Sequence, residues 1–338
     1  MSSAILLLAD GIGGGTMVLN FLFRFVAAAS LAFAVACGNT EPTSDATPSQ
    51  AEWPQPDPAL LVDGPHKDEV LYGEALIRRT YELAGPAATS VSLRYAGNNL
   101  ACGSCHLDGG RRRYGLSFIG VADAYPRNMA RENAEQSLAQ RINGCFERSM
   151  NGRPLPEDSR EMAAMIAYIE FLSETVPAGM EGRGAPAVAL LDRPADPARG
   201  ELVYRSNCVA CHGADGQGLR NADGPGYAYP PLWGPDSFNT GAGMHRIITA
   251  ANFIRANMPY GVTHDAPQLT EEQAIDVAAF INVQARPERR NLDRDYPDRA
   301  RKPVDAPFPP YDDDFSQEQH TFGPWPPITA AREARARR

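Results

Sequence analysis

Apolar positions recur at helical spacing in two stretches of this chain, and both predict buried amphipathic helices. The first stretch covers residues 158–175, where Asp158 or Ser159 can cap the helix. One face of it collects Met162, Met165, Ile166, Ile169 and Leu172. The second covers residues 270–285 and opens with Thr270-Glu-Glu-Gln273, which fits a capping box. Nowhere do apolar and polar residues alternate long enough to predict a major sheet. The pattern therefore favours a mainly α fold.

A third helix is predicted over residues 131–143, with Gly144 ending it. A weak internal repeat sets Gly73 and Tyr81 before one cysteine motif, and Gly200 and Tyr204 before another. Helices on both sides of a short cysteine-bearing segment suggest two similar α domains in tandem.

The expected organisation follows from these elements and from changes in composition. We expect a signal or lipoprotein-like segment at 1–37, a linker at 38–60, one domain at 61–178, a linker at 179–198 and a second domain at 199–290. The remaining segment, 291–338, is rich in proline, aspartate and arginine. It also carries Phe308, Tyr311, Phe315, Phe322 and Trp325, which are unusual in a free tail. We expect this extension to pack across both domains as irregular structure.

The N-terminus has the features of an export signal. Arg24 precedes the apolar run 25–36, which is short for a membrane span and suits a signal segment. The following Ala34-Val35-Ala36-Cys37 is similar to a bacterial lipoprotein cleavage site, although the usual leucine is missing. Either Cys37 carries a lipid anchor, or cleavage nearby leaves it without a role. Both alternatives predict a periplasmic protein.

Composition and charge narrow the function classes. The chain has 338 residues, of which 43% are hydrophobic and 22% charged, and its formal net charge is −9. These values are typical of a globular protein and argue against nucleic acid as a partner.

Two Cys-x-x-Cys-His motifs carry the chemistry: Cys102-Gly-Ser-Cys105-His106 and Cys208-Val-Ala-Cys211-His212. In each, the cysteines are placed to bond covalently to a c-type haem, and the histidine to ligate its iron. A zinc site or a disulfide framework is the alternative, but the histidine at the same position in both motifs favours two haems. Because helices lie on both sides of each motif, we expect two cytochrome c-like domains in tandem. Because c-type haem is attached outside the bacterial cytoplasm, this interpretation agrees with the export signal.

Each haem needs a second axial ligand unless a substrate takes that place. For the second haem the candidate is Met258, 46 residues after His212 in an Asn-Met-Pro sequence. Methionine raises the reduction potential, which suits an exit for electrons. The competing candidates are Met244, His245 and His264.

The first haem has two candidate ligands. The internal repeat aligns Met150 with Met258, but Cys145 lies five residues before Met150. A free cysteine in an exported protein is either a small buried hydrophobic residue or a thiolate on iron. The pattern alone does not separate these two interpretations.

Arginines around Cys145 favour the thiolate. Residues 111–153 contain eight arginines and no lysine against four acidic residues, a local charge of +4. Most of these arginines are explained by a solvated helical face with ion pairs. However, arginine presents a planar fork of donors that suits oxyanions, and Arg141 lies within one turn of Cys145. A cationic pocket facing a sulfur-ligated haem is thus predicted.

The first cysteine motif, continued as His106-Leu-Asp-Gly-Gly110, and the segment around Cys145 together resemble the dihaem c-type thiosulfate dehydrogenases, which form tetrathionate. The resemblance covers about residues 65–285. Its most specific part is Asn143-Gly-Cys-Phe-Glu-Arg-Ser149, with Cys145 placed 39 residues beyond His106.

The resemblance implies roles for individual residues. His106 and Cys145 would ligate the active-site haem, and Arg131 and Arg141 would hold the substrate. Met258 would ligate the second haem, and Asn257 stands where some members have a lysine ligand. Two thiosulfates would be joined into tetrathionate. The two electrons would pass from the first haem to the second and then to a soluble or membrane-bound cytochrome or another acceptor.

Other functions fit parts of the same pattern. A plain dihaem electron carrier would use Met150 as the first-haem ligand. The same site could run backwards as a tetrathionate reductase. A Sox-type cytochrome would conjugate thiosulfate to a carrier protein and would require that protein as a co-substrate.

Overall fold

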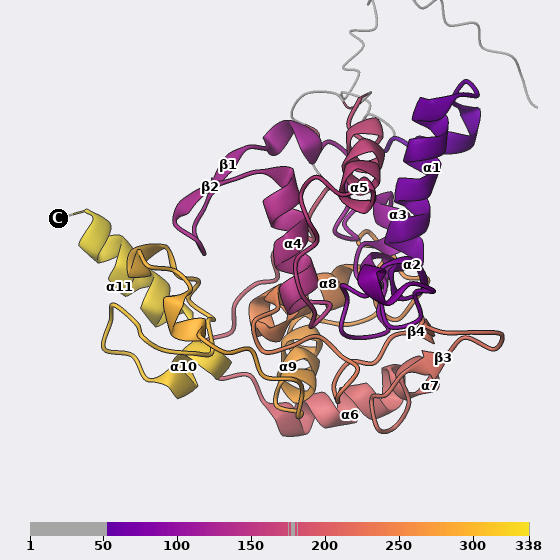
Figure 1. The fold of residues 1–338 in the computed structure, drawn as a ribbon. Helices are drawn as coiled ribbons and strands as arrows, with labels where there is room; N and C mark the ends of the chain where they lie inside the picture. Colours follow the sequence, from indigo (N-terminus) through magenta and orange to yellow (C-terminus); the bar gives the residue numbers. More distant parts are fainter. Residues whose placement is uncertain (1–52, 175, 177–179, 181, 338) are drawn as a thin grey trace, which may run out of the picture. The chain divides into compact units, whose positions relative to one another are not determined.

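The computed structural model describes residues 53–174, 176, 180 and 182–337 (Figure 1). The predicted export segment, Cys37 and most of the linker at 38–60 lie outside the described residues. Within the described part, no helix combines the length and the apolar composition that crossing a membrane requires.

The first half of the described chain is mainly helical. Its helices are α1 (Pro65–Arg78), α2 (Thr80–Leu83), α3 (Leu107–Gly110), α4 (Leu138–Arg148) and α5 (Arg160–Phe171). The strands β1 (Arg127–Met129) and β2 (Ala134–Gln136) form an antiparallel ribbon before α4, with Arg127 opposite Gln136.

The second half is built in a similar way. Its helices are α6 (Pro197–Asn207), α7 (Val209–His212), α8 (Ile247–Asn257) and α9 (Glu271–Asn282). The strands β3 (Leu219–Arg220) and β4 (Tyr227–Tyr229) pair antiparallel. Both ribbons are short, as expected from a sequence without a sheet-forming pattern.

The helix starts predicted from sequence are confirmed for α5 and α9. Ser159 accepts a hydrogen bond from the Met162 amide (3.2 Å) and caps α5. Thr270 and Gln273 form the predicted capping box at the start of α9. These caps satisfy amide groups that have no partner inside the helix.

The two halves repeat one helix crossing, in which a glycine lets two backbones touch. A Cβ on Gly73 of α1 would lie 2.0 Å from the Ala164 carbonyl oxygen of α5. A Cβ on Gly200 of α6 would lie 1.9 Å from the Asp276 carbonyl oxygen of α9. The sequence repeat of these glycines thus reflects the same close approach in both halves.

The tyrosines of the sequence repeat are not equivalent. Tyr204 is buried in α6 and its hydroxyl donates to the Gly213 carbonyl (2.7 Å). Tyr81 instead lies in α2, where its hydroxyl accepts from Asn221 of the second half (3.3 Å). Tyr81 therefore joins the two halves rather than repeating the role of Tyr204.

Gly200→Ala is expected to lower the free energy of unfolding by about 1–3 kcal/mol, because the added methyl overpacks the α6–α9 crossing. Urea denaturation of the haem-loaded protein, followed by circular dichroism, measures this loss. Gly224→Ala is the matched control, since a Cβ there meets nothing within 4 Å. Equal stability of the two variants would contradict the close approach.

The prediction of a helix at 131–143 is wrong at both ends. The helix α4 begins at Leu138, because Ser137 and Gln140 form a capping box just before it. It continues through Gly144 to Arg148. A glycine inside a helix costs only about 1 kcal/mol, which the buried face of α4 offsets. Arg131 consequently lies in the loop between β1 and β2, outside the helix.

The C-terminal extension packs against both halves, as predicted, but it is not irregular throughout. It forms α10 (Gln317–Phe322) and α11 (Pro326–Ala336), drawn in yellow in Figure 1. Trp325 and Ile328 are fully buried in the hydrophobic core of the second half. Asp295, by contrast, pairs with Arg148 of α4 in the first half. The extension is therefore an integral part of the fold.

Candidate active site

The first Cys-x-x-Cys-His motif holds its histidine in a fixed orientation. The Nδ1 atom of His106 lies 2.6 Å from the Leu116 carbonyl oxygen, and the ring stacks on Phe118. Because a carbonyl only accepts, Nδ1 carries the proton and Nε2 keeps a free electron pair for a metal. Thr80 anchors the start of the motif by accepting from the Cys102 amide (3.1 Å). Burial raises the pKa of the Cys102 thiol to about 12.

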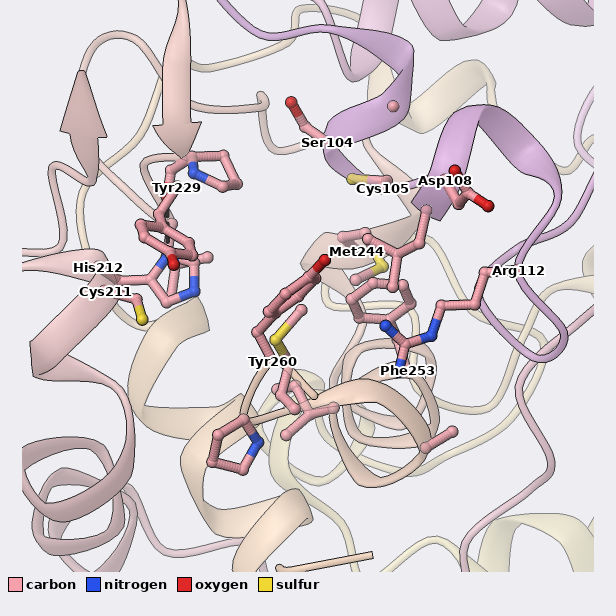
Figure 2. Close-up of a pocket in the computed structure, with 18 of the residues that line it drawn as sticks. Ser104, Cys105, Asp108, Arg112, Cys211, His212, Tyr229, Met244, Phe253 and Tyr260 are labelled. Atoms are coloured by element: carbon pink, nitrogen blue, oxygen red, sulfur yellow. Dashed lines mark hydrogen bonds between the residues drawn. The ribbon is translucent and has the colours of Figure 1, made fainter. Parts of the chain in front are cut away.

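The second motif repeats this arrangement. The Nδ1 atom of His212 lies 2.8 Å from the Pro230 carbonyl oxygen, which leaves its Nε2 free as well. Cys208, Cys211 and His212 line a cavity of about 1050 Å³, whose other walls include apolar side chains. In the view of Figure 2, Cys211 and His212 lie on one side of the cavity and Met244 and Phe253 on the other.

This cavity fits a covalently bound haem. It is large, its walls are mainly apolar, and it presents two thiols and an oriented imidazole on one side. It also extends to the first half, because Ser104, Cys105 and Arg112 line it too (Figure 2). The two Cys-x-x-Cys-His motifs thus border the same space.

The alternatives of a disulfide framework or a zinc site find no support. Among the described residues, all five cysteines are free. The same part of the chain has no cluster of three or more metal-binding side chains.

Four residues were candidates for the second ligand of the second haem, and three of them line the cavity: Met244, Met258 and His264. The fourth, His245, does not line it, and its Nδ1 lies 2.9 Å from the Thr240 carbonyl oxygen. Met258 directly follows α8, and Asn257 before it is buried and donates to the Tyr114 carbonyl (3.0 Å). The amide of Asn257 therefore ties the loop of Met258 to the first half.

Cys145 and Arg141 meet on one face of α4. They are four residues apart, and the Nη1 atom of Arg141 donates to the Cys145 sulfur over 3.1 Å. This pair lies close to the first motif. The pKa of His106 falls to about 4, mainly through burial, with the positive charge of Arg141 adding to the shift. The charge of Arg141 thus acts on the imidazole of the first Cys-x-x-Cys-His motif.

Met150, the competing ligand, is buried in the core. Its side chain is only 3% exposed and packs in the hydrophobic cluster of the first half. Cys145 is half-buried and carries the contact with Arg141. The surroundings of the two sulfurs therefore favour Cys145 as the residue that reaches a ligand or substrate.

Arg131 is held by residues that the sequence did not single out. Its Nη1 atom donates to the Gly241 carbonyl (3.0 Å), and its Nε atom donates to the Tyr296 hydroxyl (3.3 Å). Asp295 lies 3.9 Å from the same Nε. In the sequence, the only indication of these contacts is that Tyr296 is an aromatic residue within a polar extension.

Two other arginines of the 111–153 segment form ion pairs, as predicted, but these two do not lie on a solvated helical face. Arg148 forms a buried, bidentate pair with Asp295 at 2.7 and 2.8 Å. Arg111 pairs with Glu74 at 3.4 Å.

Comparison with known proteins decides the family. A model of the SoxA/TsdA cytochrome c domain matches residues 94–178, and a cytochrome c model matches residues 197–284. The thiosulfate dehydrogenase of Allochromatium vinosum is 44% identical over 239 residues, which cover 69% of this chain and 83% of that protein. This chain belongs to the thiosulfate dehydrogenase family.

Two further relatives agree with this assignment. The thiosulfate dehydrogenase of Stutzerimonas stutzeri is 42% identical, over 59% of this chain and 64% of that protein. The solved structure of thiosulfate dehydrogenase (TsdBA) from Marichromatium purpuratum, in its as-isolated form, has a TM-score of 0.63 and 38% identity. That match covers 70% of this chain and 50% of the other.

Membership of the thiosulfate dehydrogenase family confirms two predictions made from sequence. The fold consists of two mainly helical cytochrome c domains in tandem. One domain contains Cys102, Cys105 and His106, and the other contains Cys208, Cys211 and His212. The protein accordingly carries two covalently bound haem c groups.

Proposed function

We propose that this protein oxidises thiosulfate, joining two molecules into tetrathionate and releasing two electrons to an external cytochrome or other acceptor. The observation that carries the proposal is the contact between Arg141 and Cys145, which lies near enough to the first haem motif for the charge of Arg141 to lower the pKa of His106. The names of the relatives support thiosulfate as the substrate. The apolar run at 25–36 supports action in the periplasm.

Named residues would hold each haem. Cys102 and Cys105 would bond to the first group, with His106 and Cys145 as iron ligands. The corresponding set for the second group comprises Cys208, Cys211, His212 and Met258. When bound, the two groups supply two one-electron acceptors, so that together they match the two electrons of one turnover.

The electrostatic obstacle to this reaction is large. Two unit charges at 4 Å repel by about 4 kcal/mol at an effective dielectric constant near 20, and two dianions by roughly 16 kcal/mol. The net charge of −9 adds to this repulsion. Charge-assisted hydrogen bonds contribute about 1.5–3 kcal/mol each, and the arginine fork can make two to one oxyanion. Arg141, together with Arg131, would supply these bonds.

Cys145 can serve the coupling in one of two ways. It can yield its position so that thiosulfate binds there. Alternatively, its thiolate and the outer sulfur of one thiosulfate form a sulfur–sulfur bond, with loss of two electrons. The second thiosulfate then attacks that outer sulfur, tetrathionate is released, and Cys145 leaves as the thiolate. The second route keeps two free dianions from meeting.

Stopped-flow mixing of the oxidised, haem-loaded protein with thiosulfate tests the proposal. We expect rapid reduction of both haems, with one tetrathionate formed for every two electrons accepted. Sulfate is the control anion, because it has the same charge but no outer sulfur to couple. Absence of reduction by thiosulfate would instead favour a plain electron carrier.

Two variations of the function are separated in the same assay. Oxidation of the reduced protein by tetrathionate, faster than reduction by thiosulfate, would indicate a tetrathionate reductase. A requirement for an added carrier protein would indicate a Sox-type conjugation.

A further inference from the structure

Tyr296 of the C-terminal extension holds Arg131 through three separate contacts. Its amide donates to the Arg131 carbonyl (2.7 Å), and its hydroxyl accepts from Arg131 Nε (3.3 Å). Its ring also lies under the guanidinium, 5.6 Å from the central carbon. The two residues are 165 positions apart in the chain. Backbone, ring and hydroxyl of one residue thus fix both the loop and the side chain of Arg131.

The backbone of Tyr296 is in a conformation that bulky residues rarely adopt. Its φ angle is +58°, in the left-handed region, while its side chain is only 5% exposed. Such conformations persist where the surroundings overdetermine them, and they cluster at functional sites. Here the surroundings include the contacts with Arg131.

Asp295 joins the same arrangement to the helix that carries Cys145. Its carboxylate pairs bidentately with Arg148 of α4, three residues after Cys145, and lies 3.9 Å from Arg131 Nε. The Gly241 carbonyl accepts from Nη1 of both arginines, at 3.0 and 3.3 Å. Asp295 therefore fixes the positions of both Arg131 and α4 relative to the extension.

These contacts leave one end of Arg131 available. Nε and Nη1 are used, whereas Nη2 makes no hydrogen bond to any described residue. A guanidinium held by two nitrogens presents the third in a fixed direction, which suits an oxyanion.

We propose that Tyr296 and Asp295 are positioning residues for substrate, so that the C-terminal extension completes the active site by orienting Arg131. This inference rests on the proposed function, because it assigns a purpose to the orientation of Arg131. Neither residue need touch thiosulfate. Tyr296 orients the guanidinium of Arg131. Asp295 fixes the position of that guanidinium relative to α4, because its carboxylate also pairs with Arg148.

Tyr296→Phe tests the inference, because it removes the hydroxyl but keeps the ring and the amide. We expect the KM of thiosulfate to rise about tenfold, as for the loss of a hydrogen bond to a charged group. The kcat, the haem content and the ferric absorption spectrum should stay at wild-type values. Tyr311→Phe is the matched control: Tyr311 lies in the same extension, and its hydroxyl donates to the Ala306 carbonyl, away from Arg131.

A double-mutant cycle separates positioning from a merely structural role. In an Arg131→Ala background, Tyr296→Phe should have no further effect on KM, because its target is gone. An equal rise in both backgrounds would overturn the inference, as would a wild-type KM for Tyr296→Phe or an unchanged KM for Arg131→Ala. These outcomes leave thiosulfate oxidation itself standing. Failure of thiosulfate to reduce the wild-type protein would overturn both the function and this inference.

Discussion

Cys145→Gly is expected to leave both haems attached and to abolish their reduction by thiosulfate. Attachment depends on Cys102, Cys105, Cys208 and Cys211, none of which is changed. The substitution removes the sulfur that contacts Arg141 at 3.1 Å. Without the sulfur, the sulfur–sulfur route of Cys145 cannot operate, and the first haem loses its proposed thiolate ligand. The expected loss is at least about 1000-fold in kcat, the scale seen when a reacting group is removed.

Pyridine haemochrome analysis should show two haems in this variant, and stopped-flow spectroscopy should show no reduction by thiosulfate. Dithionite, which needs no substrate site, should still reduce both haems. Met150→Leu is the matched control, because Met150 is a buried core residue and a change of similar volume is tolerated. Full thiosulfate activity of Cys145→Gly, or loss of activity in Met150→Leu, would contradict the assignment of Cys145.

Arg141→Ala should give the second largest effect, a fall of roughly 100-fold in kcat/KM for thiosulfate, because a charged donor is lost. Arg141→Lys keeps the charge but loses the planar fork. We therefore expect it to raise KM by about tenfold. Steady-state kinetics over a range of thiosulfate concentrations measure both effects.

The control for this pair is Arg205→Lys. Arg205 also contacts a residue four positions away on a helix, Glu201, and its side chain is 71% exposed. Exposed pairs of this kind contribute little, so the kinetics of Arg205→Lys should match those of the wild type. An unchanged KM in Arg141→Lys would show that the fork does not bind substrate.

The helices show how far sequence reasoning reached and where it failed. The starts of α5 and α9 were predicted from Ser159 and Thr270, because a cap is a contact between residues three positions apart. The start of α4 was missed, although it too depends on a local contact, the capping box of Ser137 and Gln140. Its end was missed because Gly144 does not stop the helix.

In the candidate site, a contact between residues close in the chain was predicted, whereas contacts between distant segments were not. The pairing of Arg141 with Cys145 follows from their spacing on one helix, and the sequence placed them together. The surroundings of Met150 and Arg131 depend on segments far away in the chain. Burial in a core and contact with Tyr296 leave no local pattern that periodicity or spacing could detect.

The sequence by itself determined the two cysteine–histidine motifs, the tandem helical domains and the arginine that accompanies Cys145. Each of these is a short-range relation, decided by covalent order or by one or two helical turns. Only the tertiary structure decided that Asp295 and Tyr296 hold Arg148 and Arg131, that Met150 is buried, and that the extension belongs to the fold. The reason is physical: these contacts join segments that are up to 165 residues apart, and they form only when the whole core closes.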